Sequence, residues 1–390
     1  MANKLLFYIG DTLIGDINYI AKNRHLHETL KSEASSPTAD TFSFSVNWTL
    51  FQRFVGIYTD DNPSSLLKVG KTRIVFETDG FVRFAGWLAS KPARSGAGSA
   101  QELTLTFYEY FARLSGDLVC SSLNPNDPYV AFTDRPAHLY VQDLIDLFKA
   151  HALDAGEVLN WSYGTVDTLA KKTKVYEDFQ TISKALCDAM NNVTGAGKFD
   201  VVFRTDTSDY THQIIDILKP RGTKKNIIIK YPGDGIYKLW ASDFSVQETN
   251  DFASHILVAG NGQVGSVSSG EQTAKLGTAE NNLFAQDYCY FRRYETRSDL
   301  ESQDAVNSAA QTELANRSFA SETPEIRLVG VPIAWGDTQN GLALGDSFYF
   351  EEATDDLENN SGWFRIIELD QTWDDNGVST VTPKLTPAEG

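Results

Sequence analysis

TRIVFETDGFVRFAGW, residues 72–87, is the stretch that decides the fold. Asp79-Gly80 stands at its centre, and this residue pair readily adopts the positive φ angles that a two-residue hairpin turn requires. Runs rich in β-branched and aromatic residues precede and follow the pair, as is typical of strands. The stretch therefore predicts two antiparallel strands, 72–77 and 82–87, joined by a tight turn.

The residues after the hairpin predict a loop and a third strand. Residues 95–99 read SGAGS, and this small, polar composition indicates an exposed loop. Residues 103–107 read LTLTF, in which apolar residues recur at every second position, the period of a half-buried strand. Residues 108–114 are then expected to turn the chain away from this strand.

Four large apolar residues alternate with polar ones before the hairpin, which places them on one face of a strand. They are Phe42, Phe44, Val46 and Trp48. The pattern also predicts two opening strands, at 5–9 and 12–17, and a short helix or turn at 49–55, whereas residues 21–39 are polar and show no clear period. Five or six short strands are enough to close a small barrel or sandwich.

The pattern changes to helices and strands from about residue 116 to residue 238. Apolar residues recur at helical spacing in two runs. The first run is Val141, Leu144, Ile145 and Phe148, and the second is Val175, Phe179, Ile182, Leu186 and Met190. Strands are expected to follow at 199–203, 213–218 and 226–231, so this region reads as a mixed α+β insert.

The remaining third of the chain is predicted to be β-rich with one helix. A strand at 255–259 precedes a Ser/Gly/Thr/Ala-rich stretch that indicates an exposed loop. Residues 298–301, SDLE, have the form of a capping box and predict a helix to about residue 320. Its thin apolar stripe predicts a helix on the surface or against a neighbouring subunit. Strands are expected within 341–350, 362–367 and near Val381.

Several motifs follow one another along these predicted elements. They are FAGW at 84–87, LTLTF at 103–107, YEYF at 108–111, YEDF at 176–179, KPRG at 219–222, LALGD at 342–346 and GWFRI at 362–366. In this order they resemble the phage tail hub family, which includes the trimeric hub of contractile-tail baseplates and the tail-tip proteins of siphophages.

This resemblance implies an α+β fold that is mostly β, with two related tube-type β-barrel or β-sandwich domains and an α+β insert between them. Residues 1–115 would be the first ring-forming β-domain and residues 116–238 the insert. Residues 239–323 would contribute a strand, an exposed loop and a capped surface helix that lead back to the ring. Residues 324–390 would form the second ring-forming module, completed by part of 239–262.

The resemblance also implies a structural role without catalysis. We expect a homotrimer at the distal end of a siphophage-type tail tube, which adapts sixfold to threefold symmetry, closes the channel and opens it for DNA ejection on host adsorption. Expected partners are other copies of the chain, a distal tail (Dit-like) ring protein, the tape measure protein and receptor-binding proteins. Phage DNA would pass through the channel without specific binding, and the virion tail tip would be the protein's location.

The acidic composition bears on these partners. The 390 residues carry a formal net charge of −18, with a pI near 4.7. Non-specific binding to nucleic acid rests on Lys and Arg, so nucleic acid is disfavoured as a ligand. Residues 324–390 hold 13 acidic and 3 basic residues. A solvated surface explains this excess, and a channel wall that repels passing DNA is the functional alternative.

The cysteines and the apolar segments indicate the cellular compartment. Cys120, Cys187 and Cys289 are widely spaced, which indicates neither a disulfide framework nor a zinc site. The N-terminus lacks the apolar stretch of a secretory signal, and no window approaches the ~18 apolar residues of a membrane span. We therefore expect folding in the cytoplasm of a bacterial host, with reduced thiols in the core and no membrane span.

Candidate metal-binding and catalytic groups have simpler structural interpretations. His25 and His27 would share one face of a strand and could ligate a metal, but their polar, irregular surroundings favour two solvent-exposed histidines. Cys289 and His255 could form a thiol nucleophile and its base. Cys289, however, lies in an aromatic run typical of a buried strand.

Acidic pairs and glycines give no stronger signal. The pairs at 60–61, 355–356 and 374–375 lack the ligand spacing of a calcium loop and lie beside turn-forming residues, so solvated turns are expected. The glycines at 260–265 are not followed by a helix-forming sequence, which excludes a dinucleotide site. We therefore predict no catalytic residue, no metal and no cofactor.

Two other functions remain open. A cell-wall-degrading tail-associated enzyme would need a pocket with convergent carboxylates. A carbohydrate-binding receptor protein would present exposed aromatic faces, for which Trp161, Trp335 and Trp373 are candidates.

Overall fold

The computed structural model describes most of the chain. The described residues are 3–10, 12–33, 39–56, 67–78, 80–90, 93–95, 101–119, 130–169, 171–176, 180–191, 199–219, 221–231, 238–239, 245–248, 253–261, 274–281, 290, 292–297, 300, 302–317, 322–329, 341–352, 361–374 and 379–388. The chain divides into two compact units. Unit 1 holds residues 1–192, 198–244 and 325–390, and unit 2 holds residues 193–197 and 245–324.

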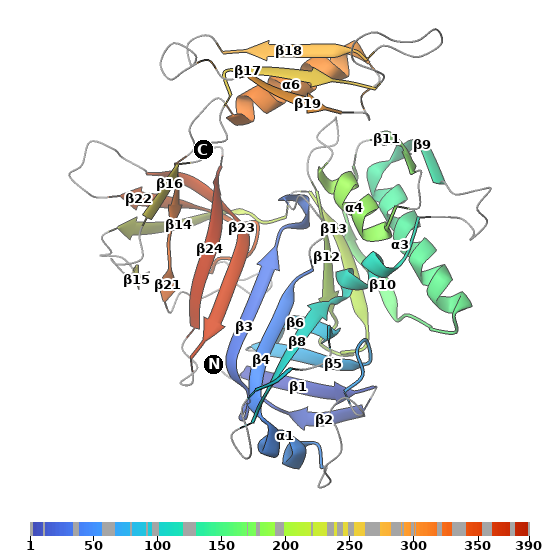
Figure 1. Ribbon diagram of the computed structural model, residues 1–390, viewed down its shortest axis with the longest axis vertical. Coiled ribbons are helices and arrows are strands. Elements are labelled where there is room, and N and C mark those ends of the chain that lie inside the picture. Colours follow the sequence, from blue (N-terminus) through green and yellow to red (C-terminus); the bar gives the residue numbers. More distant parts are fainter. Residues whose placement is uncertain are drawn as a thin grey trace. The chain divides into compact units, whose positions relative to one another are not determined.

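The N-terminal part of unit 1 is a β-domain (Figure 1). Its strands are β1 (Asn3–Ile9), β2 (Thr12–Asp16), β3 (Lys22–Thr29), β4 (Thr41–Asn47), β5 (Thr72–Thr78), β6 (Phe81–Leu88), β7 (Ala93–Ser95) and β8 (Glu102–Glu109). Its helices are α1 (Trp48–Phe54) and the 3₁₀ helices η1 (Lys31–Glu33) and η3 (Tyr110–Gly116). The strand order is β3-β4-β8-β6-β5-β1-β2. The predicted hairpin is the antiparallel pair β5 and β6, and Gly80 in its turn has a φ of +86°.

Alternation of apolar and polar residues builds the core of this domain, as predicted. Phe42, Phe44 and Val46 on β4 and all three apolar residues of the LTLTF motif on β8 are buried. The ring of Phe42 stacks on Phe76, with 5.1 Å between ring centroids, and on Phe84, at 5.7 Å. Such aromatic pairs add to the apolar area that folding removes from water. The strand pattern of β4, β5, β6 and β8 therefore follows from the sequence.

Strand β3 was missed, because residues 21–39 were expected to lack regular structure. Its burial alternates along the strand, but the buried positions include Arg24 and Glu28 beside Leu26. Charged residues at core-facing positions hide the period of two on which sequence reading depends. In the sheet, β3 lies between β4 and a strand from the other end of the chain.

The C-terminal part of unit 1 continues the same sheet through β3. Its strands are β14 (Lys224–Tyr231), β15 (Lys238–Leu239), β21 (Leu328–Val329), β22 (Ser347–Glu352), β23 (Gly362–Trp373) and β24 (Ser379–Pro387). β23 pairs antiparallel with both β3 and β24, and β22 pairs with β23 and, in parallel, with β14. Figure 1 shows β23 beside β3, and the largest sheet contains 14 strands. A separate hydrophobic core, including Phe348 and Phe364, packs on these C-terminal strands.

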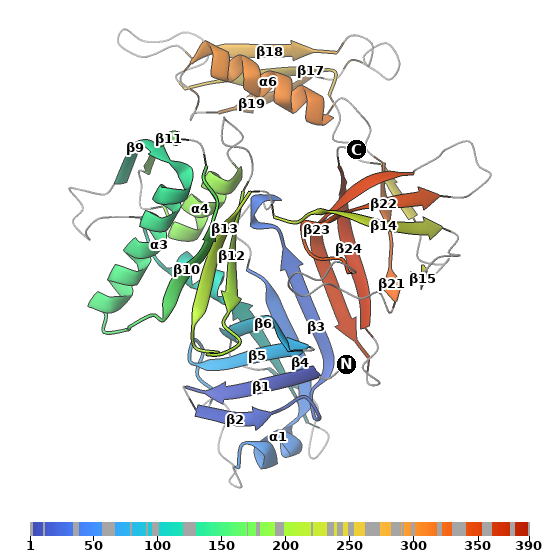
Figure 2. The same cartoon turned by 180° about the vertical axis from the view of Figure 1, so that it is seen from behind.

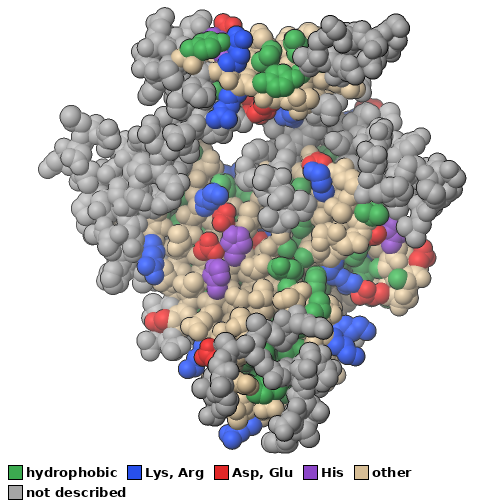
Figure 3. Space-filling model, viewed as in Figure 1, with side chains coloured by type: hydrophobic (Ala, Val, Ile, Leu, Met, Phe, Trp, Pro, Cys, Tyr) green, Lys and Arg blue, Asp and Glu red, His purple; other side chains and the backbone are tan. Residues whose placement is uncertain are grey.

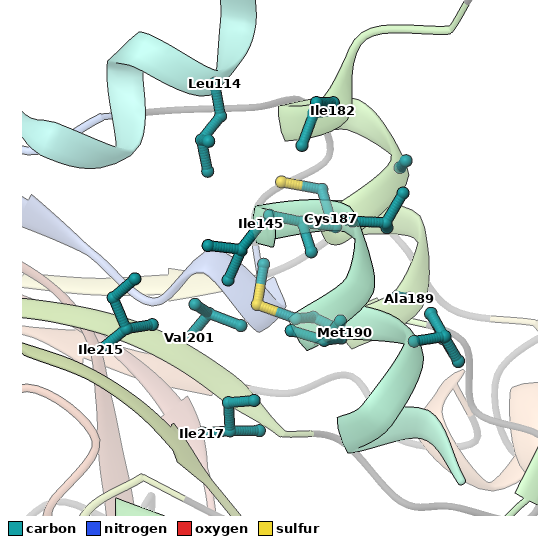
Figure 4. Close-up of a cluster of buried hydrophobic side chains, with 14 of the residues drawn as sticks. Leu114, Ile145, Ile182, Cys187, Ala189, Met190, Val201, Ile215 and Ile217 are labelled. Carbon is teal, nitrogen blue, oxygen red and sulfur yellow. The ribbon is translucent and has the colours of Figure 1, made fainter. Parts of the chain in front are cut away.

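The insert forms a third core within unit 1. Its elements are β9 (Val130–Pro136), α3 (Ala137–Asp154), β10 (Trp161–Val166), β11 (Lys171–Tyr176), α4 (Ile182–Asn191), β12 (Asp200–Thr205) and β13 (Gln213–Leu218). The helices α3 and α4 lie against the sheet β10-β13-β12 (Figure 2). Apolar residues from both helices, the sheet and η3 meet in one cluster, in which Met190 and Cys187 lie near Ile145 (Figure 4).

Two predictions for the insert were wrong in part. The second helix begins at Ile182, whereas Val175 lies in β11, which pairs with β9. Val175 fits the helical spacing of the apolar residues in α4 only by chance, because it belongs to β11, whose partner β9 lies far away in the sequence. The third predicted strand exists as β14, but it pairs with β22 in the C-terminal sheet. The first helix, α3, is as predicted, with Val141, Leu144, Ile145 and Phe148 all buried.

Unit 2 has its own small core. The sheet order is β18 (Leu276–Glu280), β17 (His255–Ala259) and β19 (Arg292–Thr296), and helix α6 (Gln303–Arg317) packs on β17 and β18. β16 (Ser245–Glu248) pairs with β20 (Glu322–Glu325). The predicted strand β17 is therefore present, and it pairs with β18 and β19; the C-terminal sheet receives β14 and β15 instead.

The predicted helix of unit 2 begins later than expected. The Ser302 hydroxyl accepts a hydrogen bond from the Ala305 amide at 3.1 Å, so Ser302 caps α6. Three residues of the predicted capping box, 298, 299 and 301, lie outside the described residues. The apolar stripe of α6 is not left for a neighbouring subunit, because Val306 and Ala310 are buried against unit 2's own sheet.

The fold is α+β and mostly β, as the sequence predicts. The domain limits at residues 115, 238 and 323 stay a prediction. No helix within the described ranges has the length and apolar content needed to cross a membrane.

Candidate functional site

A cavity of about 970 Å³ lies in unit 1 where its three cores meet. The N-terminal domain lines it from β3, η1, β6 and β8, the insert lines it from β12 and β13, and the C-terminal part contributes residues near 221–225 and 343–346. Cavities of this size commonly hold ligands when apolar groups line them. Here the lining is rich in charged side chains that pair with one another. We call these pairs the charged junction: Lys31 with Asp40 and Glu109, Arg83 with Glu28, Arg204 with Asp216, Arg221 with Asp200, and Lys225 with Asp346.

Lys31 is the most deeply buried cation of the junction. Its ammonium group lies 2.6 Å from Asp40 Oδ1 and 2.6 Å from Glu109 Oε1, and its side chain is 3% exposed. Asp40 Oδ1 also accepts a hydrogen bond from the Thr29 amide at 3.0 Å. The ammonium group lies 5.6 Å from the centre of the Phe111 ring. Lys31 therefore holds together η1, β8 and the start of η3.

Burial and charge set the protonation of this group. Burial alone would lower the pKa of Lys31, but the carboxylates of Asp40 and Glu109 outweigh it and raise that pKa above its usual value. Burial, together with the nearby charge of Asp40, raises the pKa of Glu109 to about 7 even though Lys31 opposes the shift. The Lys31 ammonium group is thus shared by the carboxyl groups of Asp40 and Glu109, and the raised pKa of Glu109 favours the neutral, protonated form of that carboxyl group.

Further ion pairs lie around the same cavity. The Arg83 guanidinium on β6 pairs with the Glu28 carboxylate on β3 through two hydrogen bonds, and both side chains are buried. Arg204 Nε lies 2.5 Å from Asp216 Oδ2 within the insert. Arg221, in the segment between the insert and β14, lies 3.7 Å from Asp200 of β12. Lys225, in β14, lies 3.6 Å from Asp346. Burial raises the pKa of Asp200.

The charged junction has the properties expected of a structural contact and not of a ligand-binding site. Buried charges are strongly destabilising when one partner is lost, so paired charges at a boundary favour one relative position of the parts. Glu77 makes a second connection of this type, because it accepts hydrogen bonds from the Tyr210 hydroxyl of the insert and from Lys4 of β1. Glu77 thus connects the insert to the N-terminal domain.

The residues considered as catalytic or metal-binding lie in different places. His25 and His27 are on the solvent face of β3, and each makes a hydrogen bond to Asp370 of β23. Their surroundings are a regular strand and not the irregular segment that was expected. His255 is buried in unit 2, with Nδ1 3.0 Å from Ser254 Oγ. Cys289, its possible partner, lies outside the described residues.

The acidic pairs and the glycines can be placed only in part. Residues 60–61, 355–356 and 375 are outside the described residues, as are Gly262 and Gly265. A Cβ atom on Gly260 would lie 2.6 Å from the Leu300 carbonyl oxygen. Gly260 therefore allows close packing beneath the residues that precede α6.

The tryptophans named for carbohydrate binding do not form an exposed platform where they are described. Trp161 is 7% exposed and stacks on Phe148, with 5.4 Å between ring centroids, and Trp373 is 6% exposed beside Phe76. Trp335 lies outside the described residues. Trp161 and Trp373 are therefore core residues.

Sequence analysis missed the charged junction. Lys31, Asp40 and Glu109 carry no common local pattern, and only the fold brings them together. A partial signal was present in the motifs, because YEYF contains Glu109, KPRG contains Arg221 and LALGD contains Asp346.

Comparison with solved structures defines the class of fold: it is that of prophage tail proteins. The chain is similar over 98% of its length, and 98% of the other chain, to the 43 kDa tail protein of prophage MuSo2 from Shewanella oneidensis, with a TM-score of 0.64 and 12% identity. It is also similar to a tail protein from Neisseria meningitidis MC58, with a TM-score of 0.61, 12% identity and coverage of 99% and 96%. Prophage tail protein gp18 from Listeria monocytogenes gives a TM-score of 0.52, 10% identity and coverage of 98% and 94%.

These likenesses extend along nearly the whole of this chain and of each similar chain. No protein-family profile and no curated protein matches the sequence. The resemblance to the phage tail hub family is thus confirmed at the level of the fold.

Proposed function

We propose that this protein is a structural component of the tail of a tailed phage or prophage, and that it acts as the hub at the distal tip. The likeness in fold to the MuSo2 tail protein, over 98% of both chains, is the observation that carries the proposal. The order of the sequence motifs supports the same assignment.

In this proposal the hub is a homotrimer of siphophage type. Each subunit contributes a β-domain from each end of the chain, so three copies present six β-modules to a sixfold ring of a distal tail (Dit-like) protein. The direct pairing of β3 with β23 supports this arrangement, because it joins the two β-rich ends into one sheet within a subunit. The charged junction would keep the two ends in a fixed relation while the ring carries load.

The hub would close the channel until host adsorption and then open it for DNA ejection. The tape measure protein would end at this hub, and receptor-binding proteins would attach around it. Acidic residues after residue 321 that face the channel would repel DNA and prevent it from adhering to the wall. Asp346 would not take part, because it is buried and accepts hydrogen bonds from the amides of Thr223 and Ala343.

Mass in solution tests the assembly. Light scattering coupled to size exclusion should give about three times the 43.2 kDa chain mass, alone or after addition of the sixfold distal-tail ring protein. A threefold ring in cryo-electron micrographs of the complex would support the hub. A chain that stays monomeric with the ring protein present would overturn it.

Two further assays address the other functions. Lysis of host cell walls in a zymogram would support a cell-wall-degrading enzyme, and binding to a glycan array would support a carbohydrate-binding receptor protein. The core positions of Trp161 and Trp373 weigh against the second of these.

A further inference from the structure

We propose that His27, Glu368 and Asp370 form a binding site for one divalent transition-metal ion, of which Zn²⁺ is the representative. Together with His25, whose ring hydrogen bonds to Asp370, we call these four residues the histidine–carboxylate cluster. No metal was expected from the sequence, and the proposal rests on where the fold places these side chains.

The pairing of β3 with β23 brings the four residues to one surface. In the register of this pair, Asp370 lies opposite His27, and Glu368 lies two residues away on the same strand. Side chains two residues apart on a strand share a face. On β3 the neighbours Leu26 and Glu28 are buried, so His25 and His27 point to the other, solvent-facing side. Figure 3 shows histidine side chains (purple) beside acidic ones (red) on this face.

The distances between possible ligand atoms suit a small metal ion. His25 Nε2 and His27 Nδ1 lie 2.9 and 3.0 Å from the same oxygen, Asp370 Oδ1. His27 Nδ1 lies 3.8 Å from Glu368 Oε1. Ligand atoms bound tetrahedrally to zinc at 2.0–2.1 Å are about 3.3 Å apart, so the observed separations bracket the required value. One ligand atom each from His27, Glu368 and Asp370 lie within 4.8 Å of one another.

The ligand types and their outer partner also fit. One imidazole and two carboxylates are ligand types that zinc and related ions use, and water can complete the coordination. The second ring nitrogen of His27, Nε2, lies 3.2 Å from Thr29 Oγ1. Metal-binding histidines commonly use this second nitrogen in a hydrogen bond that fixes the ring. Lys384 Nζ, 3.6 Å from Glu368 Oε2 and 67% exposed, can turn into solvent when an ion binds.

A metal at this position would link distant parts of the chain. His25 and Asp370 are 345 residues apart, and they belong to the strands that join the two β-rich ends of unit 1. Because the ligands come together only in the folded chain, binding would stabilise the fold. The ion would therefore strengthen the connection between β3 and β23.

Titration calorimetry and thermal unfolding of the full-length, tag-free chain test the site with Zn²⁺. The expected result is one ion per chain and a rise in Tm that a chelator reverses. His27→Ala should weaken binding by more than about tenfold and remove most of the rise in Tm. Asp370→Asn, which keeps a similar shape and can still hydrogen bond to the histidines, should do the same, which guards against misfolding of the first variant.

The control is His151→Ala. His151 Nδ1 also makes a hydrogen bond to a carboxylate, Asp117 Oδ2, at 2.8 Å, but it belongs to none of the groups of three or more possible ligands found among the described residues. This variant should bind Zn²⁺ as the unaltered chain does. The proposal is overturned if the unaltered chain binds no Zn²⁺, if binding is unchanged in His27→Ala or Asp370→Asn, or if His151→Ala loses it equally.

Discussion

Gly222 and Gly345 cross with their backbones in direct contact. Both have a φ of +91°, and a Cβ atom on Gly345 would lie 2.5 Å from the Arg221 carbonyl oxygen. The next residues continue the contact, because the Thr223 amide donates a hydrogen bond to Asp346 Oδ1 at 2.8 Å. The crossing joins the end of the insert to the start of the C-terminal sheet.

Gly345→Ala should therefore destabilise the protein strongly. A positive φ costs an L-residue about 1–2 kcal/mol, and the forced movement of packed backbone adds roughly 1–3 kcal/mol. Gly80→Ala is the matched control, because Gly80 has a φ of +86° and no atom within 4 Å of the added Cβ. Urea denaturation of both variants checks this. Equal losses of unfolding free energy would show that the crossing is not tightly packed.

Three of the seven motifs quoted from the sequence, KPRG, LALGD and GWFRI, meet at this crossing. Arg365, from GWFRI, donates from Nε to the Gly345 carbonyl at 3.2 Å and from a terminal nitrogen to the Arg221 carbonyl at 3.1 Å. KPRG and LALGD supply the other two partners. Residues that appeared only as an ordered set of short patterns are thus parts of one contact.

Local periodicity predicted most strands but not their partners. LTLTF could be read as a half-buried strand, because its period of two is complete. β3 could not be found in this way, since the charged residues Arg24 and Glu28 occupy buried positions, and Glu28 pairs with Arg83, which is 55 residues away. The same reason hid the charged junction and the histidine–carboxylate cluster. Both depend on long-range pairing, which a single sequence does not display.

Lys31→Met should cost about 3–5 kcal/mol of unfolding free energy, because it leaves the buried carboxyl groups of Asp40 and Glu109 without their cation. Lys4→Met is the matched control. Lys4 also pairs with a carboxylate, Glu77, at 2.9 Å, but its side chain is 53% exposed, so its loss should be clearly smaller. Chemical denaturation of the two variants makes the comparison. The prediction fails if both variants lose the same stability.

The combined variant Lys31→Met, Asp40→Asn, Glu109→Gln should recover part of that loss. It removes all three charges together, so that no uncompensated charge stays buried. The same denaturation assay applies. If the triple variant is less stable than Lys31→Met by itself, then the charges of Asp40 and Glu109 contribute to stability independently of Lys31.

Cys187 should resist thiol reagents in the folded protein. Burial in the insert core raises the pKa of its thiol to about 12, and the side chain lies among apolar neighbours (Figure 4). The thiolate is the reactive form, so both access and chemistry oppose labelling. Peptide mapping after maleimide treatment should find Cys187 labelled only in urea. Ser115→Cys, at an exposed position, provides the rapidly labelled control, and equal labelling of the two in native buffer would contradict the burial of Cys187.

Glu109 should make stability depend on pH in a defined direction. Its pKa is raised from 4.5 to about 7 in the folded state, so folding favours the protonated carboxyl. A group with a raised folded pKa contributes stability that is complete below its unfolded pKa and is lost as pH rises through the folded value. The window is therefore about pH 4.5 to 7. As pH rises through this window, the original chain should lose stability relative to the variant Glu109→Gln. The Gln side chain keeps an oxygen that can accept hydrogen bonds from Lys31 and from the Asp40 amide, but it cannot ionise.

The measurement is the unfolding free energy of both chains at several pH values from 4.5 to 8. Subtracting one profile from the other removes the contributions of the remaining titrating groups, because they are common to both chains. Glu102→Gln, at the exposed start of the same strand, is the control substitution. A difference between the original chain and Glu109→Gln that grows in favour of the original chain as pH rises would show that Lys31, and not burial, governs the ionisation of Glu109.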